Sequence, residues 1–183
     1  MLAAMVFLST SALPGCEKND SAQPFGVTNI FMPQATVSGG SNNNYPVPAG
    51  NDSATWNYTI DSVNNKVNVL LGVCRGGTQS YDPFSVSITT NTDTVNQLIL
   101  AGTLGAGTVL MPADLYTLPS SVSVGAGAVA ASFNLSLDET KLKLYAGSKL
   151  VLAVSIGNPT KYQLNAKLST TIVLVNVNAL PLK

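Results

Sequence analysis

The sequence predicts an all-β fold, a β-sandwich of antiparallel sheets with one short helix. Apolar residues recur at every second position in several separate windows from Thr28 onward, which is the spacing of a strand with one buried face. Glycine and proline residues between these windows predict tight turns. Strands that are apolar on one face and polar on the other suit antiparallel sheets packed in two layers.

Six windows predict strands, and each places a row of apolar side chains on one face. Polar residues such as Thr, Ser and Asn fill the alternate positions of three of the windows. Each row is therefore expected to face the core. In chain order the rows are Trp56, Tyr58 and Ile60; Val67, Val69, Leu71 and Val73; Phe84, Val86 and Ile88; Val129, Ala131, Phe133, Leu135 and Leu137; Leu150, Leu152, Val154 and Ile156; and residues 172–177.

A helix is expected between the third and fourth windows, because Thr92 or Asp93 can cap its start and Gly102 can end it. We expect this helix to cover an open end of the sandwich. A second short turn is expected at residues 138–145. The apolar residues at helical spacing in the first segment are Val95, Leu98 and Ile99.

Composition argues against an enzyme and against a nucleic-acid-binding protein. The 183 residues are 45% hydrophobic and only 10% charged, which suits one domain with a sizeable core. Nine basic and nine acidic residues cancel, so no net positive charge is available to attract phosphates. The chain has no histidine, the commonest general base and zinc ligand. We expect no catalytic residue, no metal site and no cofactor.

The N-terminus resembles a bacterial lipoprotein signal. An apolar run at residues 2–8 leads through small residues to Leu13-Pro14-Gly15-Cys16, and this arrangement is similar to a lipobox. No Lys or Arg precedes the apolar run, which departs from that pattern. Acylation of Cys16 would anchor the protein in outer-membrane lipid; the alternative is an ordinary cleaved signal with an unrelated cysteine. The predicted organisation is a signal peptide at 1–15, a tether at 16–27 and a β-sandwich domain at 28–183.

The other cysteine, Cys74, lies in an apolar run and is left without a disulfide partner if Cys16 is acylated. No histidine is present to activate its thiol. We therefore expect a buried small hydrophobic residue rather than a nucleophile.

Residues 66–72 (KVNVLLG) and 112–135 carry a resemblance to a known family, and residues 150–162 fit the same pattern. They resemble the adhesin-like domain-of-unknown-function family of Bacteroidota surface lipoproteins, whose module is similar to Calx-beta and immunoglobulin-like sandwiches. The acids behind Cys16 are similar to signals that send such lipoproteins to the cell surface. The resemblance covers most of 28–178 and implies no catalytic site. Calcium, which the Calx-beta likeness would suggest, lacks a dense cluster of acids, so Asp114 is expected to cap or close a turn.

Carbohydrate recognition needs aromatic faces and planar polar side chains. Tyr45 and Tyr81 lie beside loops rich in Pro, Gly or Asn, which favours a surface position. Trp56 is a third candidate, although it shares a predicted face with Ile60 and a core role is the alternative. The candidate ligand-binding residues are Tyr45, Tyr81 and Trp56.

A short motif, Asp followed by Ser or Thr and then a small apolar residue, occurs four times. It resembles the acceptor pattern for protein O-glycosylation in Bacteroidota. The alternative is that these pairs only form turns and helix caps. The candidate acceptors are Ser21, Ser53, Ser62 and Thr94.

Two functions remain open from the sequence. The first is a cell-surface lipoprotein that acts as a non-catalytic glycan-binding or adhesion accessory, with polysaccharide as its ligand. The second is a structural envelope protein that binds partner proteins through a sandwich face or an edge strand.

Overall fold

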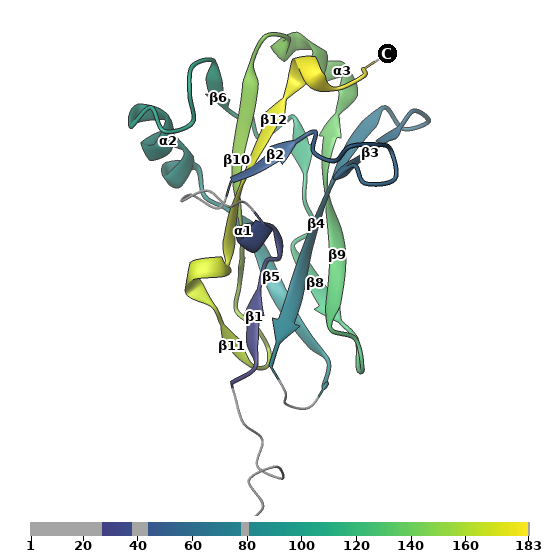
Figure 1. Cartoon of the computed structure of the whole chain (residues 1–183), viewed down its shortest axis with the longest axis vertical. Coiled ribbons are helices and arrows are strands. Elements are labelled where there is room, and N and C mark those ends of the chain that lie inside the picture. The colour runs from purple at the N-terminus through teal and green to yellow at the C-terminus, as the bar shows by residue number, and fades with distance from the viewer. Residues whose placement is uncertain (1–26, 38–43, 78–80, 183) are drawn as a thin grey trace, which may run out of the picture.

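The computed structural model describes residues 27–37, 44–77 and 81–182 of the chain. Two six-stranded sheets pack against each other as a sandwich (Figure 1). Sheet A has the order β11 (Gln163–Leu164), β1 (Asn29–Phe31), β4 (Lys66–Gly76), β9 (Ala130–Asp138) and β7 (Tyr116–Thr117), and β3 (Tyr58–Asp61) also pairs with β4. Sheet B has the order β2 (Asn44–Val47), β12 (Thr170–Asn176), β10 (Lys149–Gly157), β5 (Phe84–Thr90) and β8 (Ser121–Val124), and β6 (Thr108–Leu110) also pairs with β10.

The sheets are mixed, which corrects the expectation of purely antiparallel sheets. Three pairs are parallel: β1 with β11, β6 with β10, and β2 with β12. Each joins a short strand to a strand far away in the sequence, so no hairpin turn dictates the strand direction. The long central pairs, β4 with β9 and β10 with β12, are antiparallel as predicted.

The core lies between the two sheets and follows the predicted alternation. Val67, Val69 and Leu71 of β4 are fully buried and pair across the sheet with three apolar residues of β9. Sheet B faces them with the alternate residues of β5 and β10, which are buried in the same cluster. Burial of these apolar rows is the main stabilising contribution to the fold. The partners on β9 are Leu137, Leu135 and Phe133.

Strand β10 departs from simple alternation, because every residue from Leu150 to Val154 is buried. The second buried face comes from α2 (Thr92–Leu100), which packs Val95 against Val151 and Ala153 on the outer side of sheet B. The helix therefore covers a sheet face, and the prediction that it covers an open end of the sandwich is wrong. Its span and its end near Gly102, which has φ +68°, are as predicted.

The cap of α2 also differs from the prediction. Asn91, rather than Thr92 or Asp93, caps the helix, and its side-chain oxygen accepts a hydrogen bond from the Thr94 amide at 3.0 Å. Asp93 lies in the first turn, where a carboxylate favours the positive end of the helix dipole.

Further short helices lie among the strands, where the sequence predicted one helix and one turn. The second predicted turn is confirmed as α3 (Glu139–Leu142) followed by the 3₁₀ turn η2 (Lys143–Tyr145). The others within residues 27–37, 44–77 and 81–182 are α1 (Gln34–Val37), η3 (Ala166–Leu168) and η4 (Val177–Ala179). Among the described residues, no helix is long and apolar enough to span a bilayer.

Candidate functional site

A pocket of about 270 Å³ lies beside β2, and we call it the Tyr45 pocket. It forms where α1 and β2 lie over the open side between the two sheets (Figure 1). Tyr45 belongs to sheet B, yet its hydroxyl donates a hydrogen bond to the Leu70 carbonyl oxygen of sheet A at 3.1 Å. The lining residues are Pro33, Gln34, Tyr45, Ala49, Gly50, Thr55 and Asn57.

Asn57 is buried, and its hydrogen bonds fix the shape of the pocket. Its side-chain amide donates to the Pro46 carbonyl oxygen at 2.8 Å and accepts from the Ala49 amide at 2.8 Å. These bonds satisfy the outer edge of β2, where Pro46 and Pro48 have no N–H to offer. The side chain therefore fixes the loop 48–57 against the strand.

The Tyr45 hydroxyl lies among polar side chains. Burial raises its pKa, while side-chain hydrogen bonds from Asn57 and Gln34 act in the opposite direction. The phenol is therefore protonated at neutral pH and able to donate. The Gln34 side-chain oxygen accepts from the Gly72 amide at 3.2 Å, so α1 is tied to β4 as well as to β2.

The loop that carries Thr55 is also rigid. The Asp52 carboxylate accepts hydrogen bonds from the amides of Ala54 and Thr55, at 3.1 and 3.0 Å. Gly50 has φ +106°, and a Cβ there would collide with the Thr55 carbonyl, so the turn requires glycine. The pocket wall is preorganised by these contacts.

Trp56 lies between two pocket residues in the sequence, and its side chain is 39% exposed. Its ring stacks on Tyr58 with centroids 5.2 Å apart and an interplanar angle of 11°. Tyr58 is buried and anchors the stack in the core. The core alternative for Trp56 is therefore wrong, because the regular strand begins only at Tyr58 and the chain before it forms the loop.

Tyr81 does not join Tyr45 and Trp56. It is 51% exposed and its ring covers the guanidinium of Arg75 at 4.8 Å. Tyr58, on which Trp56 stacks, pairs with Val69 of β4. Arg75, which Tyr81 covers, lies six positions farther along the same strand, about 20 Å away at the rise of a strand.

Arg75 is a buried cation that sequence reasoning did not single out. Its side chain donates to the Asp82 carbonyl oxygen at 2.6 Å and to the Ala128 carbonyl oxygen. The rings of Phe84 and Tyr162 flank it, at 5.7 and 5.8 Å from the ring centroids. The contacts tie three loops together, so the residue stabilises this end of the sandwich.

The Asp-Ser motifs form turns where the structure describes them. The Asp61 carboxylate accepts from the amides of Val63 and Asn64, as Asp52 does in its own turn. Both motifs therefore lie in turns, and Ser53 and Ser62 are exposed. Thr94 is half-buried in the first turn of α2. The predicted signal peptide, Cys16 and Ser21 lie outside the described residues, as does the tether except for Val27.

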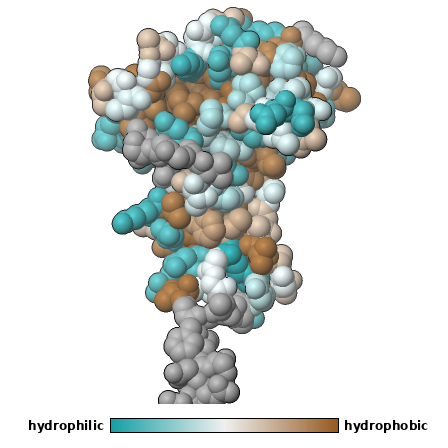
Figure 2. Space-filling model, in the orientation of Figure 1, coloured by the Kyte–Doolittle hydropathy of each residue, from teal (hydrophilic) through white to brown (hydrophobic). Residues whose placement is uncertain are grey.

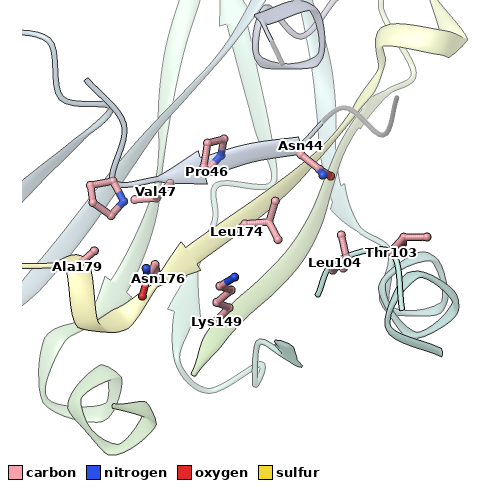
Figure 3. Close-up of a pocket in the computed structure, with 10 residues that line it drawn as sticks. Asn44, Pro46, Val47, Thr103, Leu104, Lys149, Leu174, Asn176 and Ala179 are labelled. Carbon is pink, nitrogen blue, oxygen red and sulfur yellow. The ribbon is translucent and has the colours of Figure 1, made fainter. Parts of the chain in front are cut away.

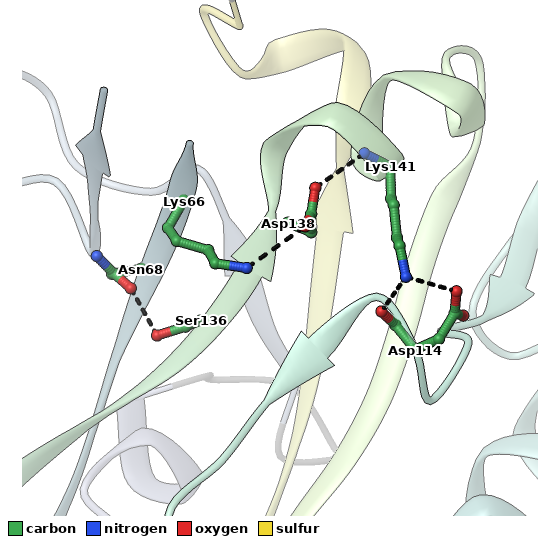
Figure 4. A network of polar contacts seen from close by, with 6 residues as sticks. All are labelled: Lys66, Asn68, Asp114, Ser136, Asp138 and Lys141. Atoms are coloured by element: carbon green, nitrogen blue, oxygen red, sulfur yellow. Dashed lines mark hydrogen bonds and ion pairs between the residues drawn. The ribbon is translucent and has the colours of Figure 1, made fainter. Parts of the chain in front are cut away.

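The acids at the end of the sandwich near α3 pair with lysines (Figure 4). Asp114 lies in a turn, as expected, and accepts a hydrogen bond from Lys141 Nζ at 2.8 Å, which lowers its pKa. Asp138 caps α3 through the Lys141 amide and also pairs with Lys66 at 3.4 Å, and both contacts lower its pKa. Among the described residues, no group of acids and cysteines is arranged to hold a metal ion.

Cys74 lies on the outward face of β4, between the inward-facing Val73 and Arg75. It is half-buried, which corrects the expectation of a buried core residue. Partial burial raises the pKa of its thiol, so the unreactive protonated form dominates at neutral pH.

Solved structures share this fold at low sequence identity. A protein of unknown function from Bacteroides ovatus matches with a TM-score of 0.54 and 18% identity, over 80% of this chain and 46% of the other. A "putative carbohydrate binding protein" from the same organism matches with a TM-score of 0.50 and 11% identity, over 80% and 36%. A second B. ovatus protein of unknown function matches with a TM-score of 0.50 and 14% identity, over 82% and 52%.

The chain spans only about a third to a half of the length of these three proteins. No curated protein matches it in sequence. Residues 30–163 match a family model described as "-like, N-terminal domain". That match covers most of the two sheets, from β1 to the first residue of β11. This chain therefore belongs to that family of N-terminal domains.

Proposed function

We propose that this chain is a non-catalytic module that binds glycan at the cell surface, with the Tyr45 pocket and the Trp56 ring as its binding site. The observation that carries the proposal is a rigid pocket lined by amide and hydroxyl groups, with the exposed indole of Trp56 carried on the same loop between two of its lining residues, Thr55 and Asn57. A structural neighbour described as a "putative carbohydrate binding protein" supports the same ligand class.

The chemistry of the pocket suits a sugar. The apolar face of a sugar ring packs against an aromatic face, and the Trp56 ring offers one that Tyr58 already holds in place. The side chains of Gln34, Tyr45 and Thr55 supply donors and acceptors for sugar hydroxyls. Because the pocket is held by its own hydrogen bonds, little conformational entropy is lost on binding.

The pocket supports recognition rather than hydrolysis. Glycoside hydrolysis usually needs two carboxylates across the scissile bond. None of the described residues that line the Tyr45 pocket is an acid, and the chain has no histidine to replace one. The three structural neighbours reported above are not described as enzymes either.

A glycan array tests the proposal. The purified protein is expected to bind a defined set of polysaccharides, and Trp56→Ala and Tyr45→Ala are each expected to lose at least about tenfold in affinity. Tyr81→Ala is the matched control, an exposed aromatic residue outside the pocket. The proposal would be contradicted if the wild type bound no glycan, or if the Trp56 and Tyr45 variants bound as tightly as the wild type does.

Anchoring through Cys16 is part of the proposal. Acyl chains on this cysteine would hold the sandwich at the outer membrane by way of residues 17–27. Metabolic labelling with a fatty acid is expected to mark the wild type in its bacterial host and to fail on Cys16→Ala. A wild type that takes up no label would contradict the acylation of Cys16.

O-glycosylation is a separate proposal for the surface. Ser53 and Ser62 are exposed in turns, and attached sugars would solvate a surface that has few charges. The intact mass of protein from its native host is expected to exceed the mass of the processed, acylated chain by whole sugar units and to drop in Ser53→Ala and Ser62→Ala. The remaining candidates, Ser21 and Thr94, are tested the same way.

A second function, binding of partner proteins, is favoured by one end of the sandwich. The Glu139 amide donates to the Asn65 carbonyl oxygen at 2.9 Å, which places the turn after β3 beside α3. Val63 in this turn is 90% exposed, and Leu144 behind α3 is 82% exposed. Envelope proteins that co-purify with the wild type but not with a Val63→Ser, Leu144→Ser variant would support this function.

A further inference from the structure

A second pocket, of about 340 Å³, lies on the outer face of sheet B, and we call it the Lys149 pocket (Figure 3). In Figure 2 the same region is a hollow with apolar side chains between α2 and β12. The volume is at the low end of the range for small-molecule sites, roughly 300–1,000 Å³. Its lining residues are Asn44, Pro46, Val47, Pro48, Thr103, Leu104, Lys149, Leu174, Asn176 and Ala179.

Strand pairing explains why these residues meet. Leu174 of β12 lies beside Pro46 of β2, and Asn176 lies beside Lys149 of β10. The neighbouring part of the same face is covered by α2 and Leu104. The pocket is the part of the face that the helix leaves open.

This pocket is separate from the Tyr45 pocket, although β2 lines both. Asn44 and Pro46 line the Lys149 pocket, whereas the residue between them, Tyr45, lines the other one. Successive side chains of a strand point to opposite faces. A ligand in one pocket therefore does not occupy the other.

Lys149 supplies a positive charge to the pocket. Its side chain is directed toward the space between Leu174 and Asn176 in Figure 3. Among the described residues, Lys149 is in no ion pair, whereas most of the other lysines pair with carboxylates. The paired lysines are Lys66, Lys141, Lys143 and Lys161.

Asn44 supplies an acceptor that is not used within the described part of the chain. Its side-chain oxygen is buried and has no hydrogen-bond donor there. A buried polar atom without a partner is costly, and ligands or bound water commonly satisfy such atoms. The pocket thus offers a cation near one wall and an unused acceptor near another, with Pro46 and Leu174 as an apolar floor.

We propose that the Lys149 pocket binds the carboxylate-bearing ring of an acidic sugar, a hexuronate. The carboxylate accepts hydrogen bonds from Lys149. A ring hydroxyl donates to the Asn44 side-chain oxygen, and the C–H face of the ring packs on Pro46 and Leu174. A neutral hexose has no charge for Lys149, so the pocket selects the acid.

Calorimetric titration of the purified protein with glucuronate, galacturonate and neutral glucose tests this. The two hexuronates are expected to bind at least about tenfold more tightly than glucose, and added salt is expected to weaken their binding. Lys149→Gln and Asn44→Asp are each expected to lose at least about tenfold for the hexuronates, whereas Lys149→Arg retains most of the affinity. Lys167→Gln, a change of an exposed lysine outside the pocket, is the matched control and is expected to bind as the wild type does.

Two outcomes would overturn the proposal: equal binding of glucose and hexuronates, or unchanged hexuronate binding in folded Lys149→Gln. Thermal unfolding of each variant confirms that it is folded. Lys149→Gln separates this site from the Tyr45 pocket, because it is expected to leave the binding of neutral glycans at the Tyr45 pocket unchanged. Failure of one site therefore does not imply failure of the other.

Discussion

At the scale of single residues, Asn57 explains why the Tyr45 pocket has a fixed shape. Its one side chain satisfies a carbonyl and an amide on the edge of β2, and its backbone amide donates to the Ala49 carbonyl at 3.1 Å. Because β2 is an edge strand, no further strand is available on that side to supply these bonds. The pocket wall and the protection of the edge therefore depend on the same residue.

Asn57→Ala is expected to destabilise the protein by about 2 kcal/mol, because it removes two part-buried hydrogen bonds to backbone groups. The measurement is the free energy of unfolding in urea. Asn134→Ala, which removes an exposed amide from β9, is the control and is expected to change the stability by less than about 0.5 kcal/mol. Equal effects of the two substitutions would show that the bonds of Asn57 contribute nothing.

The pKa of Asp138 predicts how stability depends on pH. Its pKa is lowered in the folded protein by the Lys141 amide and by Lys66, so its contribution to stability is complete above the unfolded value of about 3.9. The contribution is lost as the pH falls through the lower folded value. The difference in melting temperature between the wild type and Asp138→Ala is therefore expected to be constant near neutral pH and to shrink below about pH 4. A difference that persists undiminished to pH 2 would contradict this assignment.

Single residues were also where prediction from the sequence was least reliable. Alternation correctly placed Tyr58 in the core but wrongly extended the strand back to Trp56, because a pattern of period two does not mark where pairing begins. Arg75 was not foreseen, since its partners are carbonyls and rings from loops distant in sequence. Only the tertiary structure brings them together.

At the scale of elements, α2 does more than connect two strands. It buries Val95 against the outer face of β10 and so makes sheet B apolar on both sides at this point. The sequence predicted the helix from its spacing, but the face it covers could not be inferred. The uninterrupted apolar run at residues 150–154 was the available signal in the sequence, because such a run is typical of a strand that is buried on both faces.

Val95→Ala is expected to cost about 2 kcal/mol, through lost burial and a small cavity under the helix. Leu100→Ala is a matched control in the same helix, because Leu100 is 87% exposed, and it is expected to have an effect within about 0.5 kcal/mol. Both values come from urea unfolding. A larger loss for Leu100→Ala than for Val95→Ala would mean that the helix packs through its other face.

The long strands were predictable and the short ones were not. Strands β4, β9 and β10 carry enough alternating residues to specify their buried faces. Strands such as β1, β2 and β11 have two to four residues, so their pairing depends on tertiary context rather than on local pattern. The immunoglobulin-like and Calx-beta-like topology remains a prediction for the same reason.

At the scale of the whole molecule, the two sheets share one main core cluster. A single core predicts one cooperative unfolding transition. The fluorescence of Trp56, beside sheet A, and the far-ultraviolet circular dichroism of all strands are expected to give the same midpoint in urea. Two separated midpoints would show that the loop around Trp56 unfolds independently, and the pocket would then lack the rigidity that we assign to it.

The central claim is that the sandwich recognises glycan beside its single tryptophan. Titration of the purified protein with a polysaccharide that it retains on an array, followed by Trp56 emission, tests this most directly. We predict a saturable change in emission that Tyr45→Ala weakens at least about tenfold and Tyr81→Ala does not. Saturable calorimetric binding of a neutral polysaccharide, which has no carboxylate for the Lys149 pocket, with no change in the emission of Trp56 would contradict the account, because the sugar would then bind elsewhere.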